Sequence, residues 1–533
     1  MDEAALAHNI IGRPWTRLLG WLDYSQVAPP GFLLLEKAVV SAFNSSEFSL
    51  RLVPLLCALA SVWLSWLVCR RLFTPLPAML PFGLFALTTS LADAPMRAKP
   101  YEGDIAASLL IVLMALMLFD RPLRLSRAIG LSLVSSLTVL FSFPSVLVLA
   151  GASLAALNNA RRDAARRREL LAAAAVWIAA AGLGVLVATR SLSPADAAYM
   201  RWFWKPAFMP LGPTPITSLM WLGHQLKATF RWTLDYRASA IWSLAAAAGV
   251  WSLLRRKQDA ALLLILPVVL AVVASAAQRY PFFSGRTQLY LIPALLILAG
   301  EGAYWSQRAL LDGFSHPCSG RPSGRPSDRL KPVVYTHVKT ALAHAKWIAA
   351  VPYLLLIGLG VQATWHAWGF QGNSDLRGVF HYVRDHWRPG DRLYVHFATA
   401  QVFMYYAPQL GFTPGEYILG TCSETDESML RQVDVLRDNP RVWMAICCTD
   451  ESEPVYKYLG SLGRIRDTFA VEGRLAGESA LLRGAAILYD LSAADAGAIT
   501  PSTFPLPPYS PPAGVPPCYG LFTGPALYES GSR

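Results

Sequence analysis

Residues 161–189 read RRDAARRRELLAAAAVWIAAAGLGVLVAT, a basic cluster followed directly by a long apolar run without a charge. An α-helix needs about 20 such residues to cross the hydrocarbon of a bilayer, and the run at Leu170–Thr189 has that length. Similar runs occupy Ala260–Ala277 and Trp347–Gln362. These stretches predict an α-helical polytopic membrane protein.

The composition agrees with lipid as the surrounding solvent. Of the 533 residues, 54% are hydrophobic and only 15% are charged, whereas soluble domains are about one-quarter charged. The formal net charge of +12 is concentrated in basic clusters between apolar runs, at 70–71, 161–168 and 255–257. Such clusters are typical of cytoplasmic loops. We therefore interpret the basic charge as a sign of membrane topology, and we expect no nucleic-acid partner.

The apolar runs predict about ten spans of about 14–20 residues each. They are Leu52–Cys69, Leu76–Leu91, Ile105–Phe119, Ala128–Phe141, Pro144–Leu157, Leu170–Thr189, Ile241–Leu254, Ala260–Ala277, Thr287–Trp305 and Trp347–His366. With the arginine clusters inside, alternation places residues 1–50, 92–104, 190–240, 278–286 and all residues after 367 on the non-cytoplasmic face. Residues 307–346 then form a cytoplasmic loop.

Three regions follow from this pattern. Residues 1–366 form the transmembrane domain, in which 1–50 is a first outer loop with short interfacial helices. Residues 367–492 form a small non-cytoplasmic α/β domain, because helical and strand-like segments alternate. The Pro- and Gly-rich residues 493–533 form a disordered tail. The expected elements of the α/β domain are Ser374–Trp387, Glu427–Asp438 and Pro454–Leu462 as helices and Arg392–Phe397, Arg441–Cys447 and Ala485–Leu491 as strands.

Two features of the chain leave alternatives open. No signal peptide precedes the first outer loop. Either residues 1–50 cross the membrane unaided, or one more helix is missing upstream, and we favour the missing helix. The second feature is a set of cysteines in the C-terminal region, where disulfides can form. They are Cys422, Cys447, Cys448 and Cys518.

Basic residues on the predicted outer face run against the positive-inside rule and invite a functional explanation. One outer loop contains Arg97 and Lys99, followed by Tyr101 and Asp104; a later loop contains Arg279, Tyr280 and Arg286. Two such loops on one face can hold the phosphate of a lipid carrier. The alternative is that these side chains extend to the head groups of the outer leaflet.

A phosphate-bound sugar donor requires a base as well as cations. The base takes a proton from the acceptor, and the cations stabilise the departing phosphate. Asp2 and Glu3 are acids on the same predicted face. Judged by position alone, two acids after an initial methionine are more typical of a solvated chain end.

An ordered series of segments resembles bacterial membrane glycosyltransferases of the protein-mannosyltransferase type, in the GT-C superfamily. The segments are DEAALA at 2–7, APPGFLLLEK at 28–37, SSEFSLRLVPLL at 45–56, KPYEGD at 99–104 and YPFFSGRTQLYLIPALLILAG at 280–300. The resemblance covers about residues 1–305. It implies a GT-C-like fold and a sugar donor linked to a polyprenyl phosphate.

The resemblance also implies roles for single residues. Asp2 matches the proposed base, with Glu3 beside it. Lys99, followed by Tyr101, matches the basic residue of the second outer loop, and Arg286 matches the arginine of the late loop. This chain departs from the family where Arg97 replaces a common acid, for which Asp93 or Asp104 can substitute. No metal site is therefore expected, and dependence on a divalent metal stays open.

These observations predict an inverting integral-membrane glycosyltransferase. Its donor is a sugar on a polyprenyl phosphate, and its acceptor is a glycan, lipid or protein of the cell envelope. The expected location is a bacterial inner membrane, with the C-terminal domain outside the cytoplasm. The rival hypotheses are a transporter or flippase for envelope lipids, and a non-catalytic relative that acts as a binding protein.

Overall fold

The computed structural model describes most of the chain and resolves it into two compact units. The described residues are 2–88, 97–211, 215–233, 239–282, 285–315, 376–421, 426–447, 453–471, 484–492 and 500–505, with single positions between 351 and 362. One unit, the helical unit, comprises Ala28–Thr189 and Trp204–Gly369. The other, the sheet unit, comprises Met1–Val27, Arg190–Phe203 and Phe370–Arg533.

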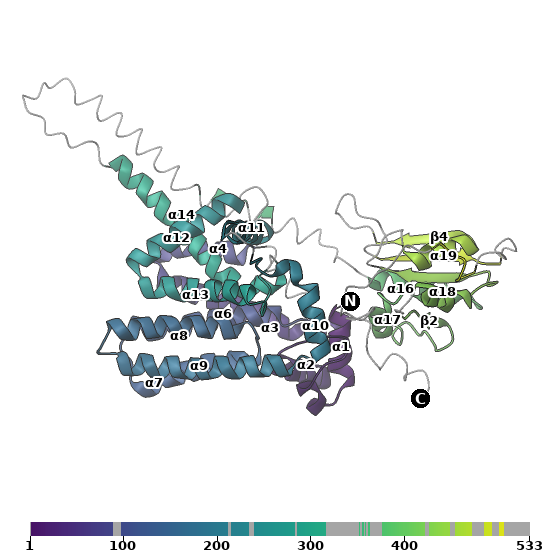
Figure 1. Ribbon diagram of the computed structural model, residues 1–533, viewed down its shortest axis with the longest axis horizontal. Helices are drawn as coiled ribbons and strands as arrows, with labels where there is room; N and C mark the ends of the chain where they lie inside the picture. Colours follow the sequence, from purple (N-terminus) through teal and green to yellow (C-terminus); the bar gives the residue numbers. More distant parts are fainter. Residues whose placement is uncertain are drawn as a thin grey trace, which may run out of the picture. The chain divides into compact units, whose positions relative to one another are not determined.

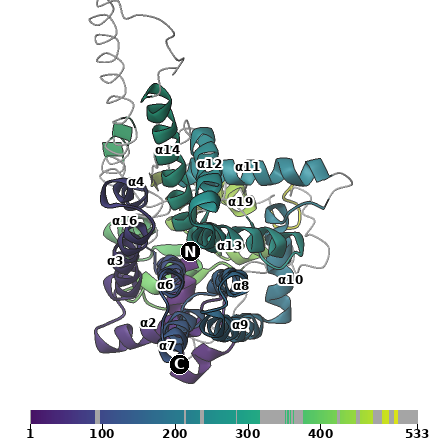
Figure 2. The same ribbon diagram turned by 90° about the vertical axis from the view of Figure 1, so that its left-hand side faces the viewer.

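The helical unit is a bundle in which Figure 2 shows α6, α8 and α9 nearly end-on. Among its described residues, five helical segments are long and apolar enough to cross a membrane. They are Glu47–Leu72 (α3), Tyr101–Asp120 (α6), Arg167–Arg190 (α9), Gln258–Ala276 (α13) and Arg286–Ala309, which joins η5 to α14. Each of the five coincides with a predicted span. The prediction of about ten spans is met for these five only.

Shorter helices occupy four more of the predicted spans. They are α4 (Pro75–Ala86), α7 (Leu125–Ser136) with η3 (Leu137–Leu140), α8 (Ser145–Arg162) and α12 (Ser239–Arg256). The predicted last span, Trp347–His366, lies mostly outside the described residues. The sequence did not predict α10 (Pro194–Phe203), η4 (Lys205–Ala207) or α11 (Pro215–Thr233) within the outer loop 190–240.

The basic clusters meet at one end of the helical unit. An Arg71 guanidinium nitrogen lies 2.7 Å from an Asp120 carboxylate oxygen, which joins the ends of α3 and α6. Lys257, just before α13, donates to the carbonyl oxygen of Arg71 at 3.0 Å. Arg162, at the end of α8, lies 3.7 Å from Asp259 in the first turn of α13. We call this the arginine-rich end; α3 and α6 begin at the opposite end.

Two glycines allow α12 and α14 (Ile292–Ser315) to pack with their backbones in contact. A Cβ atom added to Gly302 would lie 1.7 Å from the carbonyl oxygen of Ala245, and one added to Gly249 would lie 1.9 Å from that of Leu298. Small residues at such crossings are typical of helices that pack within membranes. Near this crossing, the buried Glu301 of α14 forms an ion pair with Arg256 of α12 at 2.7 Å.

The sheet unit contains a mixed β-sheet, in which Figure 1 labels β2 and β4. Its five strands follow the order β2-β1-β3-β5-β4. The strands are β1 (Arg392–Val395), β2 (Tyr417–Leu419), β3 (Val442–Ile446), β4 (Arg464–Ala470) and β5 (Ala485–Asp490). Strand β1 runs parallel to β2 and β3, whereas β5 runs antiparallel to β3 and β4. The side chains of β3 are buried along its whole length, as expected for a central strand covered on both faces.

Helices cover both faces of this sheet. Helices α16 (Leu376–Asp385) and α17 (Ala400–Tyr406) contribute to one apolar core, and α18 (Asp426–Asp434) and α19 (Pro454–Leu462) contribute to the other. Six of these elements lie where the sequence predicted them. The exceptions are α17, β2 and β4. Cys447, directly after β3, is buried and free, while Cys422, Cys448 and Cys518 lie outside the described residues.

The start of the chain belongs to the sheet unit. Helix α1 (Asp2–Gly12) packs against α17, where the carbonyl oxygen of Gln401 lies 2.9 Å from His8 Nε2. Burial lowers the pKa of His8, which favours a neutral ring. The predicted interfacial helices of residues 1–50 thus correspond to α1 in this unit and to α2 (Pro30–Ala42) in the helical unit.

Candidate functional site

The KPYEGD segment forms the transition into α6 at the end of the bundle opposite the arginines. Lys99 lies just before the helix and is 8% exposed, and Tyr101 is the first helical residue. A lysine is rarely buried to this degree unless nearby groups compensate its charge. The charges and hydrogen-bonding groups around Lys99 therefore determine which ligands the KPYEGD segment can bind.

Two buried acids follow Lys99 in the first turn of α6. Glu102 is 2% exposed and Asp104 is 8% exposed. The Asp104 carboxylate is hydrogen-bonded to the side chain of Ser142. One oxygen of each acid, Glu102 Oε1 and Asp104 Oδ1, has no hydrogen-bond partner among the described residues. These atoms can accept a proton or a hydrogen bond from a bound molecule.

A third acid comes from α2. Glu36 is fully buried and lies on the same helix face as the buried Phe32 and Leu33. Neither of its carboxyl oxygens has a hydrogen-bond partner within the described part of the chain. Burial raises the pKa of Glu36 to about 8, because a charged carboxylate is costly without water. Glu36 is therefore mostly protonated at neutral pH.

These three acids converge on one place, and we call them the acid cluster. Glu36, Glu102 and Asp104 each interact electrostatically with the thiol of Cys57 in α3. Glu102 and Asp104 also interact with each other. The cluster is thus assembled from α2 and α6 and lies beside α3. Close packing supports it, since a Cβ atom on Gly31 of α2 would lie 2.7 Å from the Leu140 carbonyl oxygen of η3.

The late loop lies beside the acid cluster. Helix η5 (Arg286–Leu291) packs against α6. The Tyr280 hydroxyl donates to the Thr287 carbonyl oxygen at 2.8 Å, and its ring meets that of Tyr290 edge-on at 6.1 Å. Burial raises the pKa of Tyr280 well above its usual range, with Tyr290 and Asp104 adding to the shift. The phenol of Tyr280 is therefore neutral and lies within electrostatic range of Asp104.

The structure thus brings some of the predicted site residues onto contacting elements and leaves others apart. Lys99, Tyr101 and Asp104 lie at the start of α6, and Tyr280 and Arg286 lie in the adjoining late loop. Arg97 and Arg279 are more exposed neighbours of these groups. Asp2 and Glu3 lie in α1, in the sheet unit. Asp93 is outside the described residues.

The acid cluster does not have the geometry of a metal site in this structure. Among the described residues, no group of three or more His, Cys, Asp or Glu side chains is arranged to hold a metal ion.

Sequence reasoning missed Glu36, Glu102 and Tyr290 as members of this site. A signal existed for Glu36, because it occupies the buried face of an otherwise apolar helix, GFLLLEK. Glu102 lies within a segment already singled out. Tyr290 gave no such signal, since a tyrosine at the start of an apolar span is also typical of the interfacial aromatic belt.

Comparison with known proteins adds two distant structural likenesses. The sequence matches no protein-family model and no curated protein. ArnT from Cupriavidus metallidurans, solved bound to undecaprenyl phosphate, is similar at 12% identity and a TM-score of 0.49, over 93% of this chain and 94% of that chain. The oligosaccharyltransferase AglB from Archaeoglobus fulgidus, in complex with an inhibitory peptide and a dolichol-phosphate, is similar at 12% identity and a TM-score of 0.48, over 87% of this chain and 68% of that chain. Likeness of this degree assigns no activity by itself.

Proposed function

We propose that this protein is an integral-membrane glycosyltransferase of the GT-C type, which transfers a sugar from a polyprenyl-phosphate donor to a cell-envelope acceptor. One observation carries the proposal. Lys99 and the acid cluster are buried together at the end of the bundle opposite the arginines. Ionisable side chains inside a membrane domain are costly and are retained for function.

Candidate groups are present both for binding the departing phosphate and for taking the proton of the acceptor. The bond between the sugar C1 and the phosphate oxygen breaks, a bond between C1 and the acceptor oxygen forms, and the acceptor proton moves to a base. Lys99 and Arg286 bind the phosphate in the substrate and take up the charge that develops as it leaves. Asp2 is the proposed base, and Glu3 orients it or the acceptor.

Neighbouring groups hold the sugar in place. Tyr101, at the start of α6, binds the phosphate together with Lys99 and Arg286. Tyr280 supplies a hydroxyl group in the late loop, and Asp104 has an oxygen without a partner among the described residues. Such groups can hydrogen-bond sugar hydroxyls. Arg97 and Arg279 add positive charge at the rim, which attracts an anionic donor.

The proposed orientation follows from the basic clusters. If the arginine-rich end faces the cytoplasm of a bacterial cell, the acid cluster faces the outside of its inner membrane. The alternation of the predicted spans places the residues after 367 outside as well. The acceptor is accordingly an envelope glycan, lipid or protein that meets the enzyme on that side.

The phosphate role can be tested with alanine variants of Lys99 and Arg286. Each is expected to lower turnover of a polyprenyl-phosphate sugar by about 10²- to 10³-fold, as for the loss of one group that stabilises transition-state charge. Arg168→Ala, an exposed arginine at the arginine-rich end, is the matched control. Wild-type turnover in both the Lys99 and Arg286 variants would remove the phosphate role.

A lipid transporter or flippase is a second candidate function. The buried, protonatable Glu36 favours it, because acids of this kind relay protons in transporters. The same assay separates the two functions. A transferase releases free polyprenyl phosphate when donor and acceptor are both present, whereas a flippase moves the intact donor across the bilayer and leaves the sugar–phosphate bond unbroken.

A further inference from the structure

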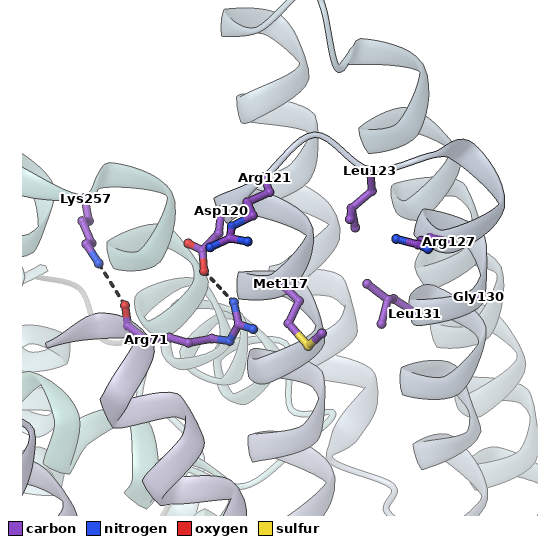
Figure 3. Close-up of a pocket in the computed structure, with 9 residues that line it drawn as sticks. All are labelled: Arg71, Met117, Asp120, Arg121, Leu123, Arg127, Gly130, Leu131 and Lys257. Atoms are coloured by element: carbon purple, nitrogen blue, oxygen red, sulfur yellow. Dashed lines mark hydrogen bonds and ion pairs between the residues drawn. The ribbon is translucent and has the colours of Figure 1, made fainter. Parts of the chain in front are cut away.

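A hollow of about 850 Å³ opens at the arginine-rich end of the helical unit (Figure 3). Its volume is typical of a ligand site. The ends of α3 and α6, the first turns of α7 and the residue before α13 surround it. Helix α6 extends from Tyr101 to Asp120, so at 1.5 Å per residue the hollow is on the order of 30 Å from the acid cluster.

The charge of the lining is strongly positive. The charged residues are Arg71, Asp120, Arg121, Arg127 and Lys257. Two of the four cations are already engaged. Arg71 lies 2.7 Å from its carboxylate partner Asp120, and Lys257 donates to the carbonyl oxygens of Arg71 at 3.0 Å and Leu72 at 3.3 Å. These contacts fix the ends of the helices and leave the positive charge in excess.

The other two cations are available to a ligand. The side chains of Arg121 and Arg127 form no hydrogen bond or ion pair with any residue that the structure describes. Figure 3 shows the Arg127 side chain extending from α7 toward the side of the hollow where Arg121 and Asp120 lie. A guanidinium group binds phosphate oxygens through two parallel N–H donors. Two such groups at one hollow therefore favour a phosphate ligand.

Apolar side chains line the same hollow and indicate where the ligand comes from. Met117, Leu123 and Leu131 lie beside the cations. On α7, Arg127, Leu131 and Val134 share one helix face, because residues four and seven positions apart lie above one another. Val134 is 49% exposed. A cation at the helix start is thus followed by an apolar stripe that extends into the bilayer, as a phospholipid requires.

We propose that this hollow binds the phosphate head group of an anionic phospholipid from the leaflet at the arginine-rich end. Arg121 and Arg127 hold the phosphate, and the acyl chain lies along the stripe of α7. Basic pockets between transmembrane helices are known to recognise anionic head groups. The site is separate from the proposed transfer reaction, because its ligand is neither donor nor acceptor.

The test measures lipid binding by the full-length protein, purified in an uncharged detergent and stripped of lipid. Phosphatidylglycerol is titrated and bound lipid is counted by native mass spectrometry, with phosphatidylcholine as the zwitterionic comparison and sn-glycerol 3-phosphate as the soluble phosphate. The test variant is R121Q/R127Q. The control is R124Q/R168Q, which removes the same charge from two exposed arginines at the same end, outside the hollow.

We expect the parent and the control variant to bind phosphatidylglycerol in preference to phosphatidylcholine. R121Q/R127Q is expected to bind it about 10- to 100-fold more weakly, the loss that follows from removing charge-assisted hydrogen bonds. R121K/R127K keeps the charge but lacks the forked donors, so its affinity for phosphatidylglycerol should lie between those of the parent and of R121Q/R127Q. Partial binding by this variant would also show that substitution at these two positions does not unfold the protein. Equal weakening in the control variant, or glycerol phosphate binding as tightly as the lipid, would overturn the proposal.

Discussion

Replacing Glu36 with glutamine should change how the stability of this protein depends on pH. The carboxyl group of Glu36 is fully buried, and neither of its oxygens has a partner among the described residues. Glutamine has nearly the same shape and never ionises. The substitution therefore removes the proton equilibrium of one buried group while it leaves the packing of α2 against its neighbours in place.

The size and sign of the effect follow from the shifted pKa. Burial raises the pKa of Glu36 from 4.5 to about 8. Between these values the folded state binds more protons than the unfolded state, so stability falls as pH rises. Each pKa unit corresponds to about 1.4 kcal/mol. Compared with a side chain of the same shape that cannot ionise, the Glu36 carboxyl group thus lowers the free energy of unfolding by up to about 3 kcal/mol at pH 7 and about 5 kcal/mol above pH 8.

The measurement is the free energy of unfolding of the purified full-length protein between pH 4 and 9, by denaturant titration followed with far-ultraviolet circular dichroism. The parent and Glu36→Gln should be similar near pH 4, where the carboxyl is protonated in both states. The glutamine variant should become progressively more stable than the parent up to about pH 8. Glu47→Gln is the control, because Glu47 forms a partly exposed ion pair with Arg51 at 2.9 Å, and surface pairs of this kind contribute less than about 1 kcal/mol.

Parallel pH profiles for the parent and Glu36→Gln would refute this reasoning. They would mean that Glu36 ionises in the folded protein as it does in water, and hence that water or a cation reaches the acid cluster. A glutamine variant that is several kcal/mol less stable even at pH 4 would mean instead that the protonated carboxyl donates a stabilising hydrogen bond.

Three further predictions follow from features described above. Gly302→Ala should destabilise the helical unit by about 1–3 kcal/mol or more through overpacking, measured by thermal unfolding, whereas Gly182→Ala, with nothing within 4 Å of the added Cβ, should not. Asp2→Asn should lower turnover of the lipid-linked donor by about 10²- to 10⁴-fold with donor binding intact, and Glu3→Gln should cost less; unchanged turnover would place the base elsewhere. A reporter that works only outside the cytoplasm should be active when fused at Asp391, and inactivity there would reverse the proposed orientation.

Much of the fold could be predicted from the sequence because its signals are local. Apolar runs such as Leu170–Thr189 mark membrane helices wherever they occur, and the buried strand β3 matches the predicted segment Arg441–Cys447. The missed strands lack such signals. Strand β2 has only three residues, and β4 reads RIRDTFA, with charges on its exposed side chains. Their pairing with neighbouring strands stabilises them, and sequence pattern alone does not show that.

The candidate site could be predicted only in part, for a related reason. The charges of KPYEGD and of the late loop were visible because they interrupt apolar sequence. The acid cluster also needs Glu36, which reaches it only when α2 packs against α3 and η3. Nor does the sequence show that α1 packs with the sheet unit, since His8 contacts Gln401 across almost four hundred residues of chain. Tertiary packing decides both features.

The close packing of α12 and α14 at Gly249 and Gly302 limits which substitutions the protein can accept during evolution. Most lipid-facing positions can exchange leucine, valine and isoleucine freely, because hydrocarbon accepts any of them. Position 302 cannot, since even a methyl group there would meet the Ala245 carbonyl oxygen. In a saturation-mutagenesis library selected for folding, nearly all folded variants should therefore have glycine at positions 249 and 302. Diverged relatives should keep both glycines even where most of the surrounding residues on the helix surface have been substituted.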